Sequence, residues 1–485
     1  MRKSFNLVAV FVAFFCLTTI VSSPMAIAGD LMILDVTIID PVNGATPHQD
    51  ILIANNLITA IGDRGSIATF APVETLDGTE KFLIPALWDA HVHLTFNPQI
   101  GDAALPLFVA NGITRVRDTG GKLDQMLAVR ERAAAMGGTA PTIYFSGPLV
   151  DGQPQVYDGT PARFPDISVG IETEDEAISE VDRLADAGAH FIKTYEMLKS
   201  QVFRALVRRA TERGLPVTSH VPLSMTVTDV ARAGVRGMEH LRNIGLSCAG
   251  NAGELLEQRS DMLNKGRDQE GSSLRSSIHA AQRPVAFAAQ DETTCNAVIQ
   301  ALADNHVFQT PTLALNTRGA LRPFLQPEWK VEAGHLPTDV FAAWTAAVEI
   351  AKTSPVSPAY AAFSDWSLAM VARLHAANVP IMAGTDTPIG FLTPGFSLHL
   401  EMETLVRAGL SPLEALASAT IRPAEFFGLE EKMGTIEVGK SSELVLLTAN
   451  PLDDIQNTRT VDTVITRGEV LDRTALNTLL ETSTP

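Results

Sequence analysis

The sequence predicts an α/β protein: a (β/α)8 barrel with a small β-sandwich built from both ends of the chain. Three observations support this fold class. Short apolar strands alternate with longer helical stretches through the centre of the chain, which is typical of parallel strands joined by crossover helices. Both ends carry short β-rich runs broken by turn residues. Polar residues stand where several central strands end, at the position where such barrels carry their functional groups.

The central strands number eight, which is what a closed barrel requires. They are predicted at 83–93, 114–117, 142–145, 191–194, 217–220, 237–240, 307–313 and 380–386. Helical periodicity between them is clearest at 174–187, 201–213 and 399–408. The stretch 246–305 is polar, mostly helical in pattern and longer than an ordinary connection, so we expect an insertion over the barrel mouth.

The ends of the chain share a different pattern. β-rich runs occur at 31–39, 51–53 and 57–61, and again at 444–447, 464–465 and 470–471. We therefore predict a signal peptide at 1–28, a β-sandwich formed by 29–84 and 433–475, a metal-dependent barrel at 85–432 and a tail at 476–485.

The charge balance restricts the partners. The chain has 37 Lys and Arg against 55 Asp and Glu, a net charge of −18. A negative net charge disfavours binding to a phosphate backbone, so no nucleic acid partner is expected. We expect a small-molecule or short-peptide substrate, and homo-oligomerisation stays open.

The first residues resemble a targeting segment. Arg2 and Lys3 precede an apolar run at 7–20, and Ala26-Ile27-Ala28 then offers small residues at the cleavage spacing. Cleavage after Ala28 predicts an exported protein, periplasmic or secreted, with no membrane attachment afterwards. The alternative is an uncleaved anchor, although the run is shorter than the ~20 residues of a spanning helix.

Export would also set the redox environment of the cysteines. Only Cys248 and Cys295 remain after residue 28, which leaves one possible intramolecular disulfide. The alternative is two buried thiols that never meet, and the sequence does not decide between them.

The candidate chemical groups lie at the predicted strand ends. They are His91, His93, Lys193, His220, His240 and Asp386. Side chains two apart on a strand face the same way, so His91 and His93 can bind one metal ion. Taken singly, His220 and His240 fit a hydrogen-bonded core histidine as well as a ligand, so the prediction of a metal site depends on the whole set.

Lys193 lies in an apolar run, where an unpaired ammonium is costly. Burial lowers the pKa of a lysine, and a neutral amine can react with carbon dioxide to give a carbamate. An N6-carboxylated Lys193 would offer two oxygen ligands and could bridge two metal ions. The alternative is a lysine whose amine reaches the surface.

Asp386 ends the last predicted strand and is followed by a turn. Alone it fits a helix or turn cap. Together with four histidines and the lysine it is predicted to be a metal ligand and a proton shuttle in hydrolysis, since zinc lowers the pKa of a bound water to about 7. His399 and Glu401 are the next candidates for the shuttle.

Several segments together resemble the amidohydrolase superfamily, in the branch related to imidazolonepropionase that includes Xaa-Pro dipeptidases and other metallo-carboxypeptidases. They are PALWDAHVH (85–93), NGITRVRD (111–118), AGAHFIK (187–193), AGLSP (408–412), ATIRPA (419–424) and GTIEVGK (434–440). The resemblance covers nearly all of the chain after residue 28. Ala86, His190 and the Ser442-Glu443 pair depart from the usual family residues, and none of them is a proposed ligand.

The resemblance implies a barrel with a β-sandwich from both termini. It places His91, His93 and Asp386 on one metal ion, His220 and His240 on a second, and carboxylated Lys193 between them. It also implies that Tyr195 contacts the substrate carbonyl, although Tyr195 fits an ordinary rim tyrosine equally well. The expected cofactors are two divalent metal ions, most simply zinc (Zn2+), because imidazole and carboxylate ligands suit that metal.

The function expected from these features is metal-dependent hydrolysis of an amide bond, in an Xaa-Pro type dipeptide or an N-acyl amino acid, by a hydroxide that bridges the metals. One alternative is a mononuclear hydrolase of cyclic amides or lactones of the imidazolonepropionase type. An alternative of another class is a periplasmic binding protein without catalysis.

Overall fold

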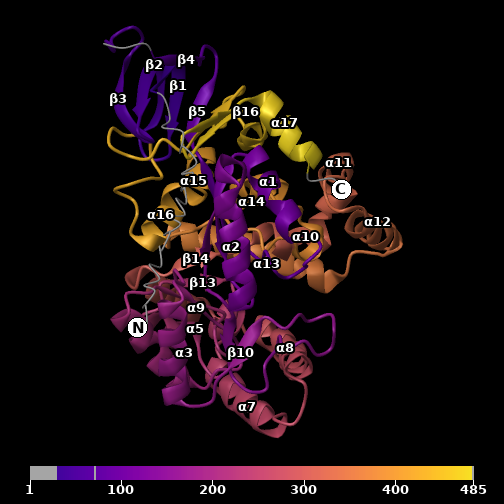
Figure 1. Cartoon of the computed structure of the whole chain (residues 1–485). Helices are drawn as coiled ribbons and strands as arrows, with labels where there is room; N and C mark the ends of the chain where they lie inside the picture. The colour runs from indigo at the N-terminus through magenta and orange to yellow at the C-terminus, as the bar shows by residue number, and fades with distance from the viewer. Residues whose placement is uncertain (1–29, 70–72, 483–485) are drawn as a thin grey trace, which may run out of the picture.

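The two ends of the chain meet in one sheet. The computed structural model describes residues 30–69 and 73–482, so the predicted signal peptide lies outside the described residues. The sheet has the order β17-β16-β15-β5-β1-β2-β3, with β4 paired to β1, and lies at the top of Figure 1. Its strands are β1 (Leu31–Asp40), β2 (Gly44–Ala54), β3 (Leu57–Asp63), β4 (Glu74–Asp77), β5 (Phe82–Pro85), β15 (Leu444–Leu447), β16 (Val461–Thr466) and β17 (Glu469–Leu471).

The junction between the ends of the chain is the pair formed by β5 and β15. β5 runs parallel to β1 and antiparallel to β15, where Leu83 lies opposite Leu446. Both leucines are fully buried and belong to one apolar cluster with Ile33. The adjacent Ile84 and Val445 belong to another apolar cluster, so successive side chains of these two strands pack on opposite faces of the sheet.

The centre of the chain contains parallel strands. One sheet has the order β6-β7-β8 and another the order β10-β9-β11-β12-β13-β14, with every pairing parallel. The strands are β6 (Leu87–Val92), β7 (Ile113–Asp118), β8 (Thr142–Phe145), β9 (Leu149–Asp151), β10 (Ser168–Gly170), β11 (Ile192–Thr194), β12 (Val217–Ser219), β13 (Gly237–Glu239) and β14 (Phe308–Thr310). The short strands β9 and β10 were not expected from the sequence.

The eighth predicted strand, at 380–386, is wrong as a regular strand. Ile381 makes a single bridge to Gln309 and Thr387 another to Val92, so this segment touches both parallel sheets. The backbone of this segment is unusual at two positions. Asp386 has a φ of 65°, which is outside the β region. Gly384 passes so close to His91 that a Cβ there would lie 2.7 Å from the histidine Cβ.

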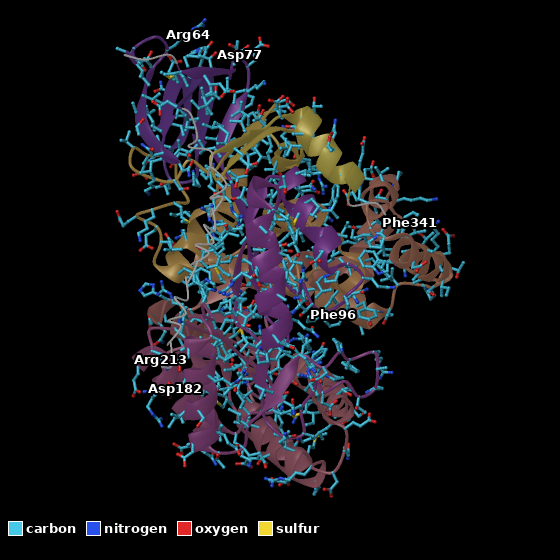
Figure 2. The ribbon with its side chains drawn as sticks, in the orientation of Figure 1. Arg64, Asp77, Phe96, Asp182, Arg213 and Phe341 are labelled. Carbon is cyan, nitrogen blue, oxygen red and sulfur yellow. A yellow bond between two sulfur atoms is a disulfide. The ribbon has the colours of Figure 1, made fainter. Side chains whose placement is uncertain are left out.

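The connections between the strands are mostly helical. The first five are α1 (Gly101–Ala110), α2 (Leu123–Ala135), α3 (Glu174–Asp186), α4 (Ser200–Glu212) and α5 (Val227–Arg232). Thr173 and Glu176 form a capping box that starts α3. On the outer surface, Asp182 of α3 pairs with Arg213 just after α4 at 2.6 Å (Figure 2). The apolar residues of α4 face inward, which is why its periodicity is visible in the sequence.

The later part of the chain is also helical. Its helices are α10 (Leu313–Leu321), α11 (Pro327–Ala333), α12 (Thr338–Thr353), α13 (Pro358–Ala376), α14 (Phe396–Arg407), α15 (Pro412–Ser418), α16 (Ile421–Phe427) and α17 (Arg473–Thr482), with 3-10 turns η2 (Pro323–Leu325), η3 (Ile389–Phe391) and η4 (Ile455–Arg459). A further 3-10 turn, η1 (Gly137–Thr139), follows α2 earlier in the chain. Helix α17 covers most of the segment that was predicted to be a tail. No helix in the described part of the chain has the length and apolar character needed to cross a membrane.

The segment expected to be an insertion consists of four helices. They are α6 (Ile244–Ser247), α7 (Ala252–Lys265), α8 (Gly271–Ala288) and α9 (Glu292–Asp304), of which α7 and α8 lie at the bottom of Figure 1. Cys248, at the end of α6, forms a disulfide with Cys295 in α9. The sequence left this pairing open, and the structure decides in favour of the disulfide. The bond fixes both ends of the segment that carries α7 and α8.

Removing this disulfide is expected to lower the free energy of unfolding by about 2–4 kcal/mol, because the bond closes a 47-residue loop in the unfolded chain. The change is the double substitution Cys248→Ala with Cys295→Ala, measured by urea unfolding. Wild type should show the same loss when unfolded in reductant, and the double variant should not respond to reductant. Equal midpoints for oxidised and reduced wild type would contradict the expectation.

Candidate metal centre

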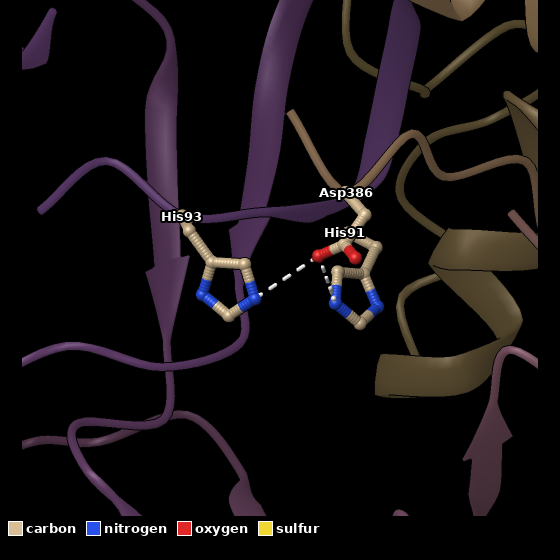
Figure 3. A group of neighbouring side chains, drawn as sticks. All are labelled: His91, His93 and Asp386. Atoms are coloured by element: carbon tan, nitrogen blue, oxygen red, sulfur yellow. Dashed lines mark ion pairs between the residues drawn. The ribbon is translucent and has the colours of Figure 1, made fainter. Parts of the chain in front are cut away.

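Three predicted ligands converge at one point. The Nε2 atoms of His91 and His93 lie 3.2 and 3.1 Å from Oδ1 of Asp386, and Figure 3 shows this oxygen between the two rings. One ligand atom from each of the three residues lies within 4.8 Å of the others, so the group has the size of a metal site. All three side chains are buried. The strand end of β6 and the segment after Ile381 bring them together.

The four histidines are oriented in the same way. Each uses Nδ1 for a hydrogen bond to the surrounding protein, as is usual for metal-binding histidines. The partners are Glu239 for His91, the Gly120 carbonyl for His93, Glu196 for His220 and Thr312 for His240, at 2.7, 3.0, 3.0 and 2.8 Å. The Thr312 hydroxyl donates to the Pro311 carbonyl, so it accepts from His240. With its proton on Nδ1, each ring has an unprotonated Nε2 that can bind a metal ion.

His220 and His240 stand beside the first three residues. The ring centroids of His240 and His91 are 4.5 Å apart, and those of His220 and His240 are 4.7 Å apart. Burial, the largest influence, lowers the pKa of both His220 and His240 well below the ordinary histidine value. The lowered pKa favours the neutral form of both rings, which is the form that binds a metal ion.

Lys193 projects from β11 and is 1% exposed. Its Nζ lies 3.9 Å from Oε1 of Glu239 and makes no hydrogen bond to any described residue. Burial lowers the pKa of this amine to about 8, with Glu239 opposing the change. The neutral amine is therefore far more accessible at pH 7 than for an ordinary lysine, which meets the chemical requirement for carbamate formation.

The backbone is strained at two of the predicted ligands. His240 and Asp386 have φ angles of 57° and 65°, a region that is unfavourable for residues with a Cβ. Nε2 of His240 lies 4.0 Å from Oδ2 of Asp386, so the two side chains face the same space. Burial alone would raise the pKa of Asp386, but the imidazoles of His240 and His91 outweigh it and hold this pKa well below the usual range.

All seven residues predicted for the site line one cavity of about 220 Å³. They are His91, His93, Lys193, Tyr195, His220, His240 and Asp386. The ring of Tyr195 stacks on His220 with centroids 4.4 Å apart. Burial raises the pKa of Tyr195 well above its ordinary value, so its hydroxyl keeps its proton. Three arginines, Arg242, Arg275 and Arg318, also line the cavity.

Two buried carboxylates that support the site were not predicted. Glu239 accepts from Arg117 at 2.7 Å as well as from His91. Glu196 accepts from Arg275 at 2.7 Å and from His279 at 2.6 Å, both on α8 of the insertion. Glu196 directly follows Tyr195, and Glu239 directly precedes His240. Nothing in the sequence indicates which distant residues these two carboxylates bind.

The two reserve candidates for the proton shuttle lie elsewhere. His399 hydrogen-bonds through Nδ1 to Thr458 at 2.9 Å. Glu401 accepts from the backbone N–H groups of Leu313 and Ala314, at the start of α10. Neither lines the cavity of the predicted ligands, so the expectation that they could replace Asp386 is wrong.

A family model described as "Amidohydrolase family" matches residues 82–471, which span the parallel strands and the candidate metal site. The chain belongs to the amidohydrolase family. This membership confirms the resemblance inferred from the sequence motifs. It also supports the predicted class of enzyme, a metal-dependent hydrolase acting on C–N bonds.

Individual relatives either match only part of this chain or have low sequence identity to it. An imidazolonepropionase of Thermoplasma acidophilum is 37% identical over 103 residues, which are 20% of this chain and 25% of that protein. Bottromycin amidohydrolase is a structural neighbour with a TM-score of 0.67 and 23% identity, covering 93% of this chain and 90% of the other. A Xaa-Pro dipeptidase with bound methionine has a TM-score of 0.64 and 18% identity, covering 91% and 100%. At these identities the structural neighbours establish the fold.

The residues present fit a metal ion. His91 Nε2, Asp386 Oδ1 and Lys193 Nζ are buried atoms that lack hydrogen-bond partners in the described part of the chain. Buried polar atoms are rarely left in this state, and an absent ion is one reason for it. Imidazole nitrogens with a carboxylate oxygen are the donor set that zinc prefers.

Proposed function

We propose that this protein is an exported, binuclear metal-dependent amidohydrolase that cleaves the amide bond of a dipeptide or N-acyl amino acid. The observation that carries the proposal is the convergence of four oriented histidines, Asp386 and an unpartnered buried Lys193 on one cavity. His91, His93 and Asp386 would hold one ion and His220 with His240 the other. N6-carboxylated Lys193 would lie between them.

Two divalent cations, when bound, would polarise the scissile carbonyl and acidify the attacking water. The protein's own groups then supply the remaining steps. Asp386, held ionised, accepts a proton from the water and delivers it to the leaving nitrogen, because an amide does not break unless the amine leaves protonated. Tyr195, which keeps its proton, donates a hydrogen bond to the carbonyl oxygen.

The arginines of the cavity support a substrate with a free carboxylate. Arg275 and Arg318 come from α8 and α10 and both line the cavity, and Arg275 also donates to Glu196. Arginine binds carboxylates with paired, directional hydrogen bonds. A dipeptide or an N-acyl amino acid has such a carboxylate next to the bond that is cleaved, whereas a simple lactone does not.

We further propose that the parallel strands close into a (β/α)8 barrel through the segment after Ile381. The Met382 N–H donates to the Gln309 carbonyl and the Ala90 N–H donates to the Ala383 carbonyl, which links β14 to β6 through this segment. The export proposal is supported by the disulfide, because such bonds persist in oxidising compartments.

The experiment that tests the function is a hydrolysis screen of Xaa-Pro dipeptides, other dipeptides and N-acyl amino acids. Turnover of at least one of these groups is expected. Turnover confined to lactones or cyclic amides would favour the alternative of an imidazolonepropionase-type enzyme. Absence of any hydrolysis by protein that contains its metals would favour a binding protein instead.

Metal content is expected to be close to two ions per chain, because six candidate ligands exceed the needs of one ion. Elemental analysis of the purified full chain measures this number. Removal of the ions by a chelator should abolish hydrolysis, and added zinc should restore it. A reproducible value of one ion in fully active enzyme would instead support a mononuclear site.

A further inference from the structure

A second, smaller cavity of about 40 Å³ adjoins the metal centre. His240 and Arg242 line both cavities. The other side of the small cavity is formed by the insertion, which contributes Arg259 from α7 and Arg283 from α8. The space is enough for a carboxylate or a few water molecules, since a water needs only ~10–15 Å³ measured in this way.

Two arginines of this cavity, Arg259 and Arg283, lack negative partners among the described residues. Arg259 is 1% exposed, and its hydrogen bonds go to neutral oxygens, Gln282 Oε1 at 2.6 Å and Asn243 Oδ1 at 3.3 Å. Among the described residues no carboxylate oxygen lies within 4.0 Å of Arg259 or of Arg283. Arg283 is exposed, and its guanidinium carbon lies 6.0 Å from the Phe363 ring centroid.

In the described part of the chain, Glu196 is the one carboxylate within 4.0 Å of an arginine of this cavity, and its oxygens are already hydrogen-bonded to other groups. Glu196 accepts from Arg275, His279 and His220, all within 3.0 Å, and Arg242 comes no closer to it than 4.0 Å. The cavity and its surroundings therefore hold an excess of positive charge within a protein whose net charge is −18. This excess is local and lies beside the site of the reaction.

Arg259 cannot remove its charge by losing a proton. Burial lowers the pKa of its guanidinium to about 10, which still leaves it charged at neutral pH. An uncompensated buried charge is strongly unfavourable, and the usual compensation is a paired anion. Water in the cavity would solvate the guanidinium but would not neutralise it.

We propose that this arginine cavity, formed by Arg242, Arg259 and Arg283, binds a second carboxylate of the substrate. The preferred substrates are then amides of an acidic amino acid, such as an Xaa-Glu dipeptide or an N-acyl glutamate. This inference rests on the proposed amide hydrolysis. It adds a specificity site that is separate from the metal ligands and is built by the insertion.

The first test compares pairs of substrates that differ in one charge: Ala-Glu with Ala-Gln, and N-acetylglutamate with N-acetylglutamine. The acidic member should have a kcat/KM ~10- to 10²-fold higher, the range for hydrogen bonds to a charged group. Arg283→Gln should remove most of this preference while leaving turnover of the Gln substrate within a few-fold of wild type. Arg267→Gln, an exposed arginine after α7, is the matched control and should keep the preference.

The buried arginine is tested by a conservative pair of variants. Arg259→Lys keeps the charge and should keep part of the preference, whereas Arg259→Gln should lose it. Unfolding midpoints show whether each variant is folded. If Arg259→Gln does not fold, the result with the exposed Arg283 still decides the question.

A binding measurement separates this inference from the proposed function. Glutarate should raise the Tm of the full chain with its metals more than the neutral glutaramide does, and Arg283→Gln should lose that extra shift. If no amide is hydrolysed but this shift occurs, the hydrolysis proposal fails and the anion site stands. Equal kcat/KM for the acidic and amide substrates, with equal Tm shifts from glutarate and glutaramide, would overturn the inference.

Discussion

Lys193→Ala is expected to abolish hydrolysis, with a loss in kcat/KM greater than the ~10²-fold typical of residues that only orient a ligand. The reason is that Lys193 is fully buried within the site and its amine has no hydrogen-bond partner among the described residues, so a carbamate there would serve as a ligand to both ions. Alanine removes this ligand altogether. The measurement is steady-state hydrolysis of the best substrate, together with metal content.

A rescue experiment distinguishes the carbamate from a simple loss of charge. Short carboxylic acids such as acetate or propionate fit the space left by the side chain, and they should restore part of the activity of Lys193→Ala but not raise that of wild type. Lys352→Ala, an exposed lysine on α12, is the control and should behave as wild type. Full activity of Lys193→Ala without any additive would refute the bridging role.

Asp386→Asn should reduce kcat by ~10²–10⁴, the usual contribution of general acid–base catalysis. Asparagine has nearly the same shape as aspartate but cannot accept the proton of the attacking water. His91 and His93 remain in place, so the variant should retain at least one metal ion. Steady-state kinetics and elemental analysis of the same preparation measure both effects.

The control for this variant is Asp365→Asn, an exposed aspartate on α13. It should leave kcat unchanged. If Asp386→Asn contains its metals and turns over within a few-fold of wild type, another group moves the proton. That group would have to be a different one from His399 and Glu401, which are hydrogen-bonded elsewhere.

The sequence predicted best the features that depend on local pattern. Strand β15 occupies the predicted residues, and α3 and α4 match within one residue because their apolar faces repeat with the helical period. The segment before Asp386 has the apolar composition of a strand, but its pairing depends on Gly384 passing close to His91. Contacts of that kind join residues that are far apart in the chain, so periodicity does not reveal them.

The same distinction applies to the site. The seven predicted residues lie near the ends of predicted strands, and a parallel arrangement of strands is enough to bring strand ends together. Glu196 and Arg275 are 79 positions apart, and their contact depends on how α8 packs against the parallel strands. A single sequence contains no signal for such packing, which is why the arginines of the insertion were not recognised.

The position of β15 between β5 and β16 has a consequence for how the protein is made. Synthesis delivers the chain from its N-terminus, so β5 has an unpaired edge until residue 447 has emerged. An unpaired edge that carries buried side chains such as Leu83 is a template for association with other chains. A product that stops before Leu444 retains every candidate metal ligand, yet it should accumulate as aggregates, whereas a fusion attached after residue 485 leaves the sheet intact.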